Sequence, residues 1–182
     1  QVGDLNTIKP EGKYELDRSF ENYVLIPGLV EGHSHLFEGA LWSKLYCGYF
    51  DRQKPDGTMS LGIKNVKDLV QMLKHENENL LDPNDPLAGW GLDPIYFDDK
   101  ALDRKILDAV SDQRPIGILH ASGHKLNINS VGLKLAGFLR TGINHEGLPL
   151  GEDGLPSGEI RGAETIALVT KHVGLGKDWL SG

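Results

Sequence analysis

The sequence has a single cysteine, Cys47, so no disulfide bond can form within the chain. This scarcity favours a reducing compartment, and we expect a cytoplasmic protein. Long apolar runs are also missing: none approaches the roughly 20 residues that a membrane-spanning helix needs. The opening residues, "QVGDLNTIKPEGK", show no signal-peptide core. We therefore predict no membrane partner.

Basic runs are absent as well. The chain carries 19 Lys and Arg residues against 26 Asp and Glu residues, for a formal net charge of −7. Binding to a phosphate backbone requires a basic surface, so no nucleic-acid partner is predicted. The remaining composition, 39% hydrophobic and 25% charged, is typical of a globular protein. Its 182 residues suffice for one domain, or for one domain and part of another.

Strand patterns and helix patterns alternate along the chain, which favours an α/β architecture. Asn65 is a candidate cap for the clearest helix, because apolar side chains recur after it with helical spacing. The predicted elements are β-structure over 1–30, helices within 57–81, 98–110, 127–138 and 162–176, strands within 87–97 and 114–124, and loops or a hairpin over 144–160.

One apolar strand runs directly into two histidines, in "LIPGLVEGHSHLFEGALW". In an extended segment Glu31, His33 and His35 point to one face, about 6.7 Å apart from one to the next. Neutral imidazole is the commonest metal donor, and zinc takes such nitrogens at about 2.0–2.1 Å. The pattern predicts a divalent metal, zinc in the first place, at His33 and His35. A polar strand end without a metal is the alternative, and two ligands alone do not complete a site.

Several segments resemble a known family. "YELDRSFENYVLIPGLVEGHSH" looks like the entry to the catalytic barrel of the amidohydrolase superfamily. "AGWGLDP", "LDRKILDAVSDQRPIGILHASGHKLNINSVGLKLAGF" and "DGLPSGEIRGAE" are similar, in order and spacing, to its YtcJ-like branch, the amidohydrolase-3 family. Two positions depart from that pattern. Glu31 stands where relatives commonly have Asp, and Gly162 where they often have Glu, with Glu159 and Glu164 nearby.

The resemblance implies part of a TIM-barrel amidohydrolase. Its parts would be the end of a small β-sandwich (1–22), the first barrel strand with the histidine pair and the segment after it (23–60), and an inserted α/β lobe (61–182). A complete barrel needs about 200–250 residues, so we expect an N-terminal portion. The remaining ligands and the catalytic residues would lie beyond residue 182, and the isolated portion would be inactive.

The reaction that the resemblance implies is hydrolysis of an amide-type C–N bond, other than a peptide bond, in a small-molecule substrate by metal-activated water. A non-catalytic binding or interaction module stays open, because the ligand set is incomplete. A cyclic-amide hydrolase or deaminase of the same superfamily also stays open. Exposed barrel edges would favour a homo-oligomer.

Three residues are candidates for substrate binding. His124 follows a predicted strand in a loop, where binding residues often lie, but it can also pack against the turn. Asn129 can bind substrate or cap the next helix, a role that Asn127 can also take. Trp90, between two glycines, can stack on a ligand or belong to the core. His120 is predicted to be buried, with its hydrogen bonds satisfied.

Overall fold

The computed structural model describes residues 7–8, 12–24, 26, 28, 38–97 and 102–176. By its contacts the chain divides into two units, residues 1–34 and 35–182. In the first unit, residues 13–18 have no regular structure and turns occupy 19–22, so the prediction of β-structure over 1–30 is wrong for these residues. A strand needs a neighbour for its backbone N–H and C=O groups, and the described residues of this unit pair with none.

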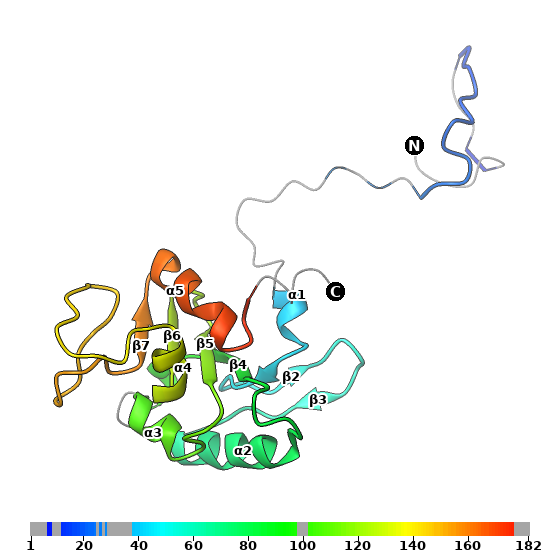
Figure 1. The fold of residues 1–182 in the computed structure, drawn as a ribbon. Coiled ribbons are helices and arrows are strands. Elements are labelled where there is room, and N and C mark those ends of the chain that lie inside the picture. Colours follow the sequence, from blue (N-terminus) through cyan, green and yellow to red (C-terminus); the bar gives the residue numbers. More distant parts are fainter. Residues whose placement is uncertain are drawn as a thin grey trace. The chain divides into compact units, whose positions relative to one another are not determined.

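The second unit is built on a five-stranded mixed sheet in the order β1-β4-β5-β6-β7 (Figure 1). The strands are β1 (Leu45–Tyr46), β4 (Leu87–Leu92), β5 (Ile116–His120), β6 (Lys125–Ile128) and β7 (Glu159–Arg161). The pairs β1–β4 and β4–β5 are parallel, and β5–β6 and β6–β7 are antiparallel. A separate hairpin pairs β2 (Arg52–Gln53) with β3 (Met59–Ser60). The α/β prediction is confirmed.

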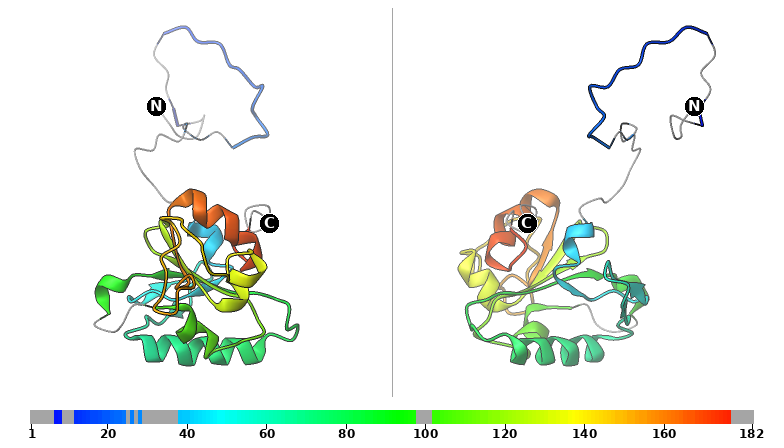
Figure 2. Two further views of the ribbon diagram at one scale, coloured as in Figure 1. Left: turned by 60° about the vertical axis from the view of Figure 1, so that its left-hand side comes forward. Right: turned by 90° about the vertical axis from the view of Figure 1, so that its right-hand side faces the viewer.

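Helices cover both faces of the sheet (Figures 1 and 2). They are α1 (Glu38–Leu41), α2 (Val66–Asn79), α3 (Arg104–Asp108), α4 (Ser130–Leu135) and α5 (Ala163–Val169), with short 3₁₀ turns η1 (Pro94–Tyr96) and η2 (Thr170–His172). On one face α2 and α3 bury Leu69, Leu73 and Leu107 against β5. On the other, Leu41, Leu133 and Val169 of α1, α4 and α5 pack against β6 and β7. Each sheet face thus has its own hydrophobic core.

Most of the predicted elements of this unit are confirmed. Asn65 caps α2, its side chain accepting a hydrogen bond from the Asp68 N–H at 2.8 Å. The helix predicted within 127–138 begins only at Ser130, because β6 occupies the residues before it. In β6, the side chain of Leu126 belongs to the hydrophobic core on one face of the sheet. The side chain of the adjacent Asn127 lies on the other face, where it donates a hydrogen bond to the Leu102 carbonyl. This alternation is the period-two pattern of a strand held between two neighbours.

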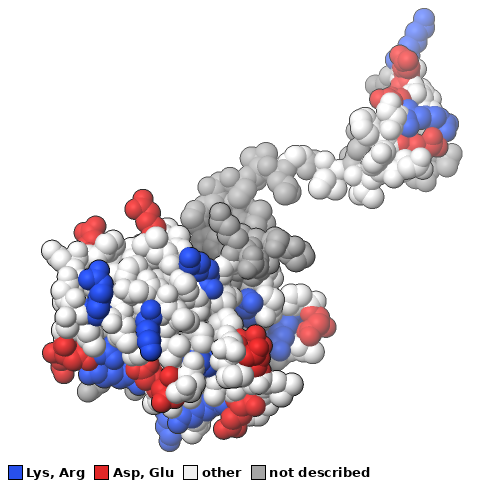
Figure 3. Space-filling model, in the orientation of Figure 1, with Lys and Arg blue, Asp and Glu red and all other residues white. Residues whose placement is uncertain are grey.

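The three-part division of the sequence stays a prediction. Its second and third parts contribute to one sheet, since Leu45 of β1 lies opposite Gly89 of β4. Among the described residues, no helix is long and apolar enough to cross a membrane. On the face seen in Figure 3, basic and acidic side chains are interspersed over the unit that carries the sheet.

Gly158 is the last residue of the "DGLPSG" turn. At this point the backbone of the turn contacts the start of α3 and the end of β6. The Arg104 N–H donates to the Ser157 carbonyl at 2.7 Å, and the Ile128 N–H to the Gly158 carbonyl at 2.8 Å. Gly158 has a φ of 96°, and a Cβ there would lie 2.5 Å from the Ile128 oxygen and 2.8 Å from the Arg104 nitrogen. The close approach and the backbone angle both require glycine.

Gly158→Ala is expected to lower the free energy of unfolding of the 182-residue chain by about 3 kcal/mol. Roughly 1–2 kcal/mol comes from the left-handed backbone and the rest from overpacking. Gly154→Ala is the matched control, because its φ of 73° is similar but no atom lies within 4 Å of its added Cβ. Urea denaturation measures both, and equal losses would show that the close approach does not matter.

Candidate functional site

The predicted metal ligands His33 and His35 lie outside the described residues, so this site stays a prediction. Within the part of the chain that the structure describes, no three His, Cys, Asp or Glu side chains gather closely enough to hold an ion. Burial raises the pKa of the Cys47 thiol to about 12. Cys47 is completely buried among apolar side chains and is therefore a core residue.

Asn129 is the cap of α4. Its side-chain oxygen accepts hydrogen bonds from the N–H groups of Gly132 and Ile116, both at 3.0 Å. Its amide nitrogen donates to the carbonyls of Ser111 at 3.0 Å and Arg114 at 2.8 Å. The side chain is completely buried. These four bonds give Asn129 the structural role that the sequence left open, and leave no group of its amide for a substrate.

Trp90 belongs to a buried aromatic cluster. Its ring centroid lies 5.1 Å from that of Trp42 and 5.2 Å from that of Tyr46, both in edge-to-face geometry. Only 3% of the residue is exposed, which supports the core interpretation. Its indole N–H has no acceptor among the described residues. Trp90 therefore packs like a core residue, with one polar group that the described residues leave unpaired.

His124 lies in the turn between β5 and β6, with its side chain exposed. Its carbonyl oxygen accepts a hydrogen bond from the Gly162 N–H at 3.0 Å. This bond ties the turn to the residue that precedes α5. The turn at Gly123 and His124 and the segment that follows "DGLPSG" both belong to the stretches that resemble the family. The hydrogen bond makes them adjacent in space.

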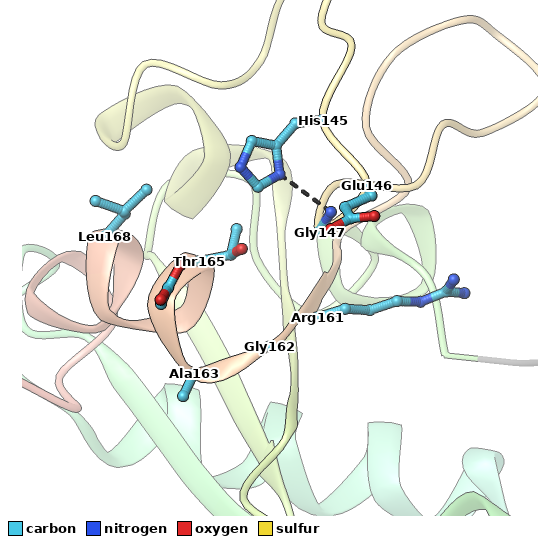
Figure 4. Close-up of a pocket in the computed structure, with 9 residues that line it drawn as sticks. His145, Glu146, Gly147, Arg161, Gly162, Ala163, Thr165 and Leu168 are labelled. Atoms are coloured by element: carbon cyan, nitrogen blue, oxygen red, sulfur yellow. Dashed lines mark hydrogen bonds between the residues drawn. The ribbon is translucent and has the colours of Figure 1, made fainter.

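An open cavity of about 880 Å³ lies at Gly162 (Figure 4). Its polar side chains are those of His145, Glu146, Arg161, Glu164 and Thr165, and the rest of its lining comes from Gly147, Gly162, Ala163 and Leu168. His145 Nδ1 accepts a hydrogen bond from the Gly147 N–H at 3.0 Å, so Nε2 carries the proton of the neutral ring. In Figure 4, Arg161 extends away from His145. The cavity therefore offers hydrogen-bond donors and two carboxylates, but no ligand set for a metal.

Polar side chains also line one face of β6 and β7. Glu159 interacts with Lys125 at 3.3 Å and with Arg161 Nε at 2.5 Å. Partial burial raises the pKa of Glu159, but the hydrogen bond from Arg161 and the two positive charges lower it further than burial raises it. Glu159 is therefore ionised and paired with both cations, and one of them, Arg161, also lines the cavity.

His120, at the end of β5, is 6% exposed, as expected of a buried histidine. Its Nε2 lies 2.5 Å from Asn127 Oδ1. Asn127 Nδ2 in turn donates to the Leu102 carbonyl at 2.7 Å. Burial lowers the pKa of His120, and the bond to Asn127 opposes that effect only in part. The ring is therefore neutral at pH 7.

The lowered pKa of His120 predicts a loss of stability in acid. An unfolded imidazole titrates near pH 6.5, above the folded value, so the unfolded chain binds more protons as the pH falls below 6.5. The contribution of His120 is complete above pH 6.5 and is lost as the pH falls through the folded pKa. Its slope is at most about 1.4 kcal/mol per pH unit.

Urea denaturation of the 182-residue chain between pH 7 and pH 5 measures this slope. His120→Gln should flatten the dependence, whereas the same change at the exposed His75 should leave it as it is. Parallel curves for the native chain and His120→Gln would rule out the predicted linkage.

Comparison with known proteins gives one family and several relatives. The model of a family described as "Amidohydrolase family" matches residues 21–173. Protein LONG AFTER FAR-RED 3 of Arabidopsis thaliana is 28% identical over 140 residues, which are 76% of this chain and 22% of that protein. The YtcJ protein of Bacillus subtilis (strain 168) is 27% identical over 143 residues, 77% of this chain and 25% of that protein.

A similar fold occurs in the crystal structure of an uncharacterized metal-dependent hydrolase from Pyrococcus horikoshii OT3. The TM-score is 0.50 at 17% sequence identity, over 78% of this chain and 23% of that one. At this identity the likeness shows a shared fold. The chain spans about a quarter of the length of each of these three proteins.

Proposed function

Because the chain belongs to the amidohydrolase family, in its YtcJ-like amidohydrolase-3 branch, we propose that it is the N-terminal part of a metal-dependent hydrolase that cleaves amide-type C–N bonds other than peptide bonds. The observation that carries the proposal is the family match over residues 21–173, which includes both His33 and His35. The mixed α/β fold, shared with a metal-dependent hydrolase, supports it.

We propose that His33 and His35 hold a divalent metal, with zinc as the first candidate. Such an ion, when bound, lowers the pKa of a water molecule and polarises a carbonyl group. The two histidines are too few to complete a site, and the described residues supply no further ligand cluster. The remaining ligands and the catalytic residues would come from a barrel to which this chain gives the first strand.

The parts of the chain would then have separate tasks. Residues 1–22 would end a β-sandwich, residues 23–60 would carry the first barrel strand, and residues 61–182 would form a lobe on the substrate side. Two candidates for substrate contact remain: His124, which is exposed on its turn, and Trp90, whose indole N–H has no acceptor in the described part of the chain. The substrate would be a small molecule, and the enzyme a cytoplasmic protein able to form homo-oligomers.

The proposal is tested by comparing the natural full-length protein with the isolated 182 residues. The full-length protein should copurify with zinc or another divalent metal and should hydrolyse members of a panel of N-acyl amino acids and cyclic amides, but not peptides. The isolated 182 residues should bind zinc weakly and be inactive. A full-length protein without metal and without hydrolysis would favour a binding module. Nanomolar zinc affinity in the isolated chain, lost in His33→Ala, would contradict the incomplete ligand set.

A further inference from the structure

The two walls of the cavity at Gly162 are held together by direct contacts. The Arg161 N–H donates to the Gly147 carbonyl at 2.9 Å, which ties the loop at residues 145–147 to the end of β7. A Cβ at Gly147 would lie 2.3 Å from Thr165 Oγ1, so glycine lets this loop approach α5 closely. The cavity is therefore fixed by contacts within the chain, and its volume of about 880 Å³ is in the range of small-molecule sites.

His145 presents a hydrogen-bond donor to this cavity. Its Nδ1 accepts the Gly147 N–H at 3.0 Å, so the neutral ring carries its proton on Nε2. None of the described residues accepts a hydrogen bond from this Nε2, and the side chain is exposed. The bond from Gly147 therefore fixes which nitrogen of His145 can donate to a ligand.

A hydroxyl, a carboxylate and an apolar side chain line the same cavity. Thr165 is 6% exposed, and its hydroxyl group can donate a hydrogen bond as well as accept one. The Glu164 carboxylate forms no ion pair with any described residue. Leu168 is 55% exposed and adds apolar surface. In Figure 4 the side chains of His145, Thr165 and Leu168 lie at one end of the cavity, whereas Arg161 extends away from them.

We propose that this cavity binds a free α-amino acid with an apolar side chain. Its carboxylate would accept from His145 Nε2 and the Thr165 hydroxyl, because two donors at one end of the cavity match two oxygens. Its ammonium group would pair with Glu164, since a hydrogen bond between charged groups is about twice as strong as one between neutral groups. The amino-acid side chain would pack on Leu168. The proposal concerns binding and does not require that the protein be a hydrolase.

The test uses NMR of the natural full-length protein with ¹⁵N-labelled histidine at neutral pH. The His145 resonances are assigned by their loss in His145→Gln, and L-leucine should shift the Nε2 resonance in a saturable way. 4-Methylpentanoate is leucine without its ammonium group, and 3-methylbutylammonium chloride is leucine without its carboxylate. Each should bind at least about tenfold more weakly than L-leucine, because it lacks the hydrogen bonds of one charged group.

Glu164→Gln should weaken the affinity for L-leucine by about tenfold and leave the affinity for 4-methylpentanoate unreduced. Glu152→Gln is the matched control, because it changes an exposed carboxylate that does not line the cavity. No shift of the His145 resonance with L-leucine, an equal affinity for either of the two analogues, or equal losses in Glu164→Gln and Glu152→Gln would each overturn the proposal. The three ligands are compared on the native protein, so that result does not depend on the folding of any variant.

Discussion

Replacement of His33 by alanine in the full-length protein is expected to lower kcat/KM for amide hydrolysis by about 10³-fold or more, and His35→Ala should do the same. A metal ion contributes several kcal/mol to transition-state stabilisation, and each 1.36 kcal/mol is a factor of ten in rate. Both histidines are proposed to hold that ion. The loss of either should therefore remove most of the activity, together with the bound metal.

The control is His75→Ala, which removes an exposed imidazole on α2. Metal content by mass spectrometry, circular dichroism and kcat/KM are measured for all three variants. The two ligand variants should keep their fold and lose metal, whereas His75→Ala should keep both metal and activity. Full metal content in His33→Ala and His35→Ala would remove the basis of the proposed metal site.

Asn129→Leu is expected to lower the free energy of unfolding of the 182-residue chain by about 5 kcal/mol. The change leaves two buried N–H groups and two buried carbonyls without the partner that Asn129 supplies. Each buried polar group left unpaired costs about 1–3 kcal/mol, and partial relaxation reduces the sum. A loss of this size consumes much of the stability of an ordinary domain.

Two other variants calibrate that loss. Asn129→Asp keeps both acceptor bonds and loses both donor bonds, so its stability should lie between those of the native chain and Asn129→Leu. Asn65→Ala removes the exposed cap of α2 and should cost only about 1 kcal/mol. Urea denaturation followed by circular dichroism measures all three. An Asn129→Leu variant as stable as Asn65→Ala would show that the buried amide is not the structural cap described above.

Elements with a strong internal pattern were predictable from the sequence, and elements defined by their neighbours were not. Helix α2 has a cap and a long apolar repeat, and β4 and β5 are continuous apolar strands between turns. Strands β6 and β7 have four and three residues and lie in the sheet because each pairs with the strand beside it. Pairing of this kind is not visible in a local pattern, and the sequence therefore places Asn127 and Ile128, the second half of β6, in the following helix.

The same distinction applies to the candidate site. His33 and His35 could be proposed from the sequence, because their spacing within a predicted strand carries the chemical argument. The cavity at Gly162 was missed because residues 145–147 and 161–168 meet only after the loop between them has folded back. The hydrogen bond between His120 and Asn127 depends on the register of β5 and β6, which brings the two side chains together. Sequence alone left Asn127 and Asn129 as equal candidates for a cap, and the hairpin register decides between them.

The short strands at the two sides of the sheet also bear on self-association. Among the described residues, the outermost strands are β1 with two residues and β7 with three. Backbone pairing between copies would gain only a few hydrogen bonds there, and the charged side chains of Glu159 and Arg161 make β7 a poor template for strand addition. Homo-oligomers built through this unit are accordingly expected to rest on side-chain contacts and to resist growth into fibrils.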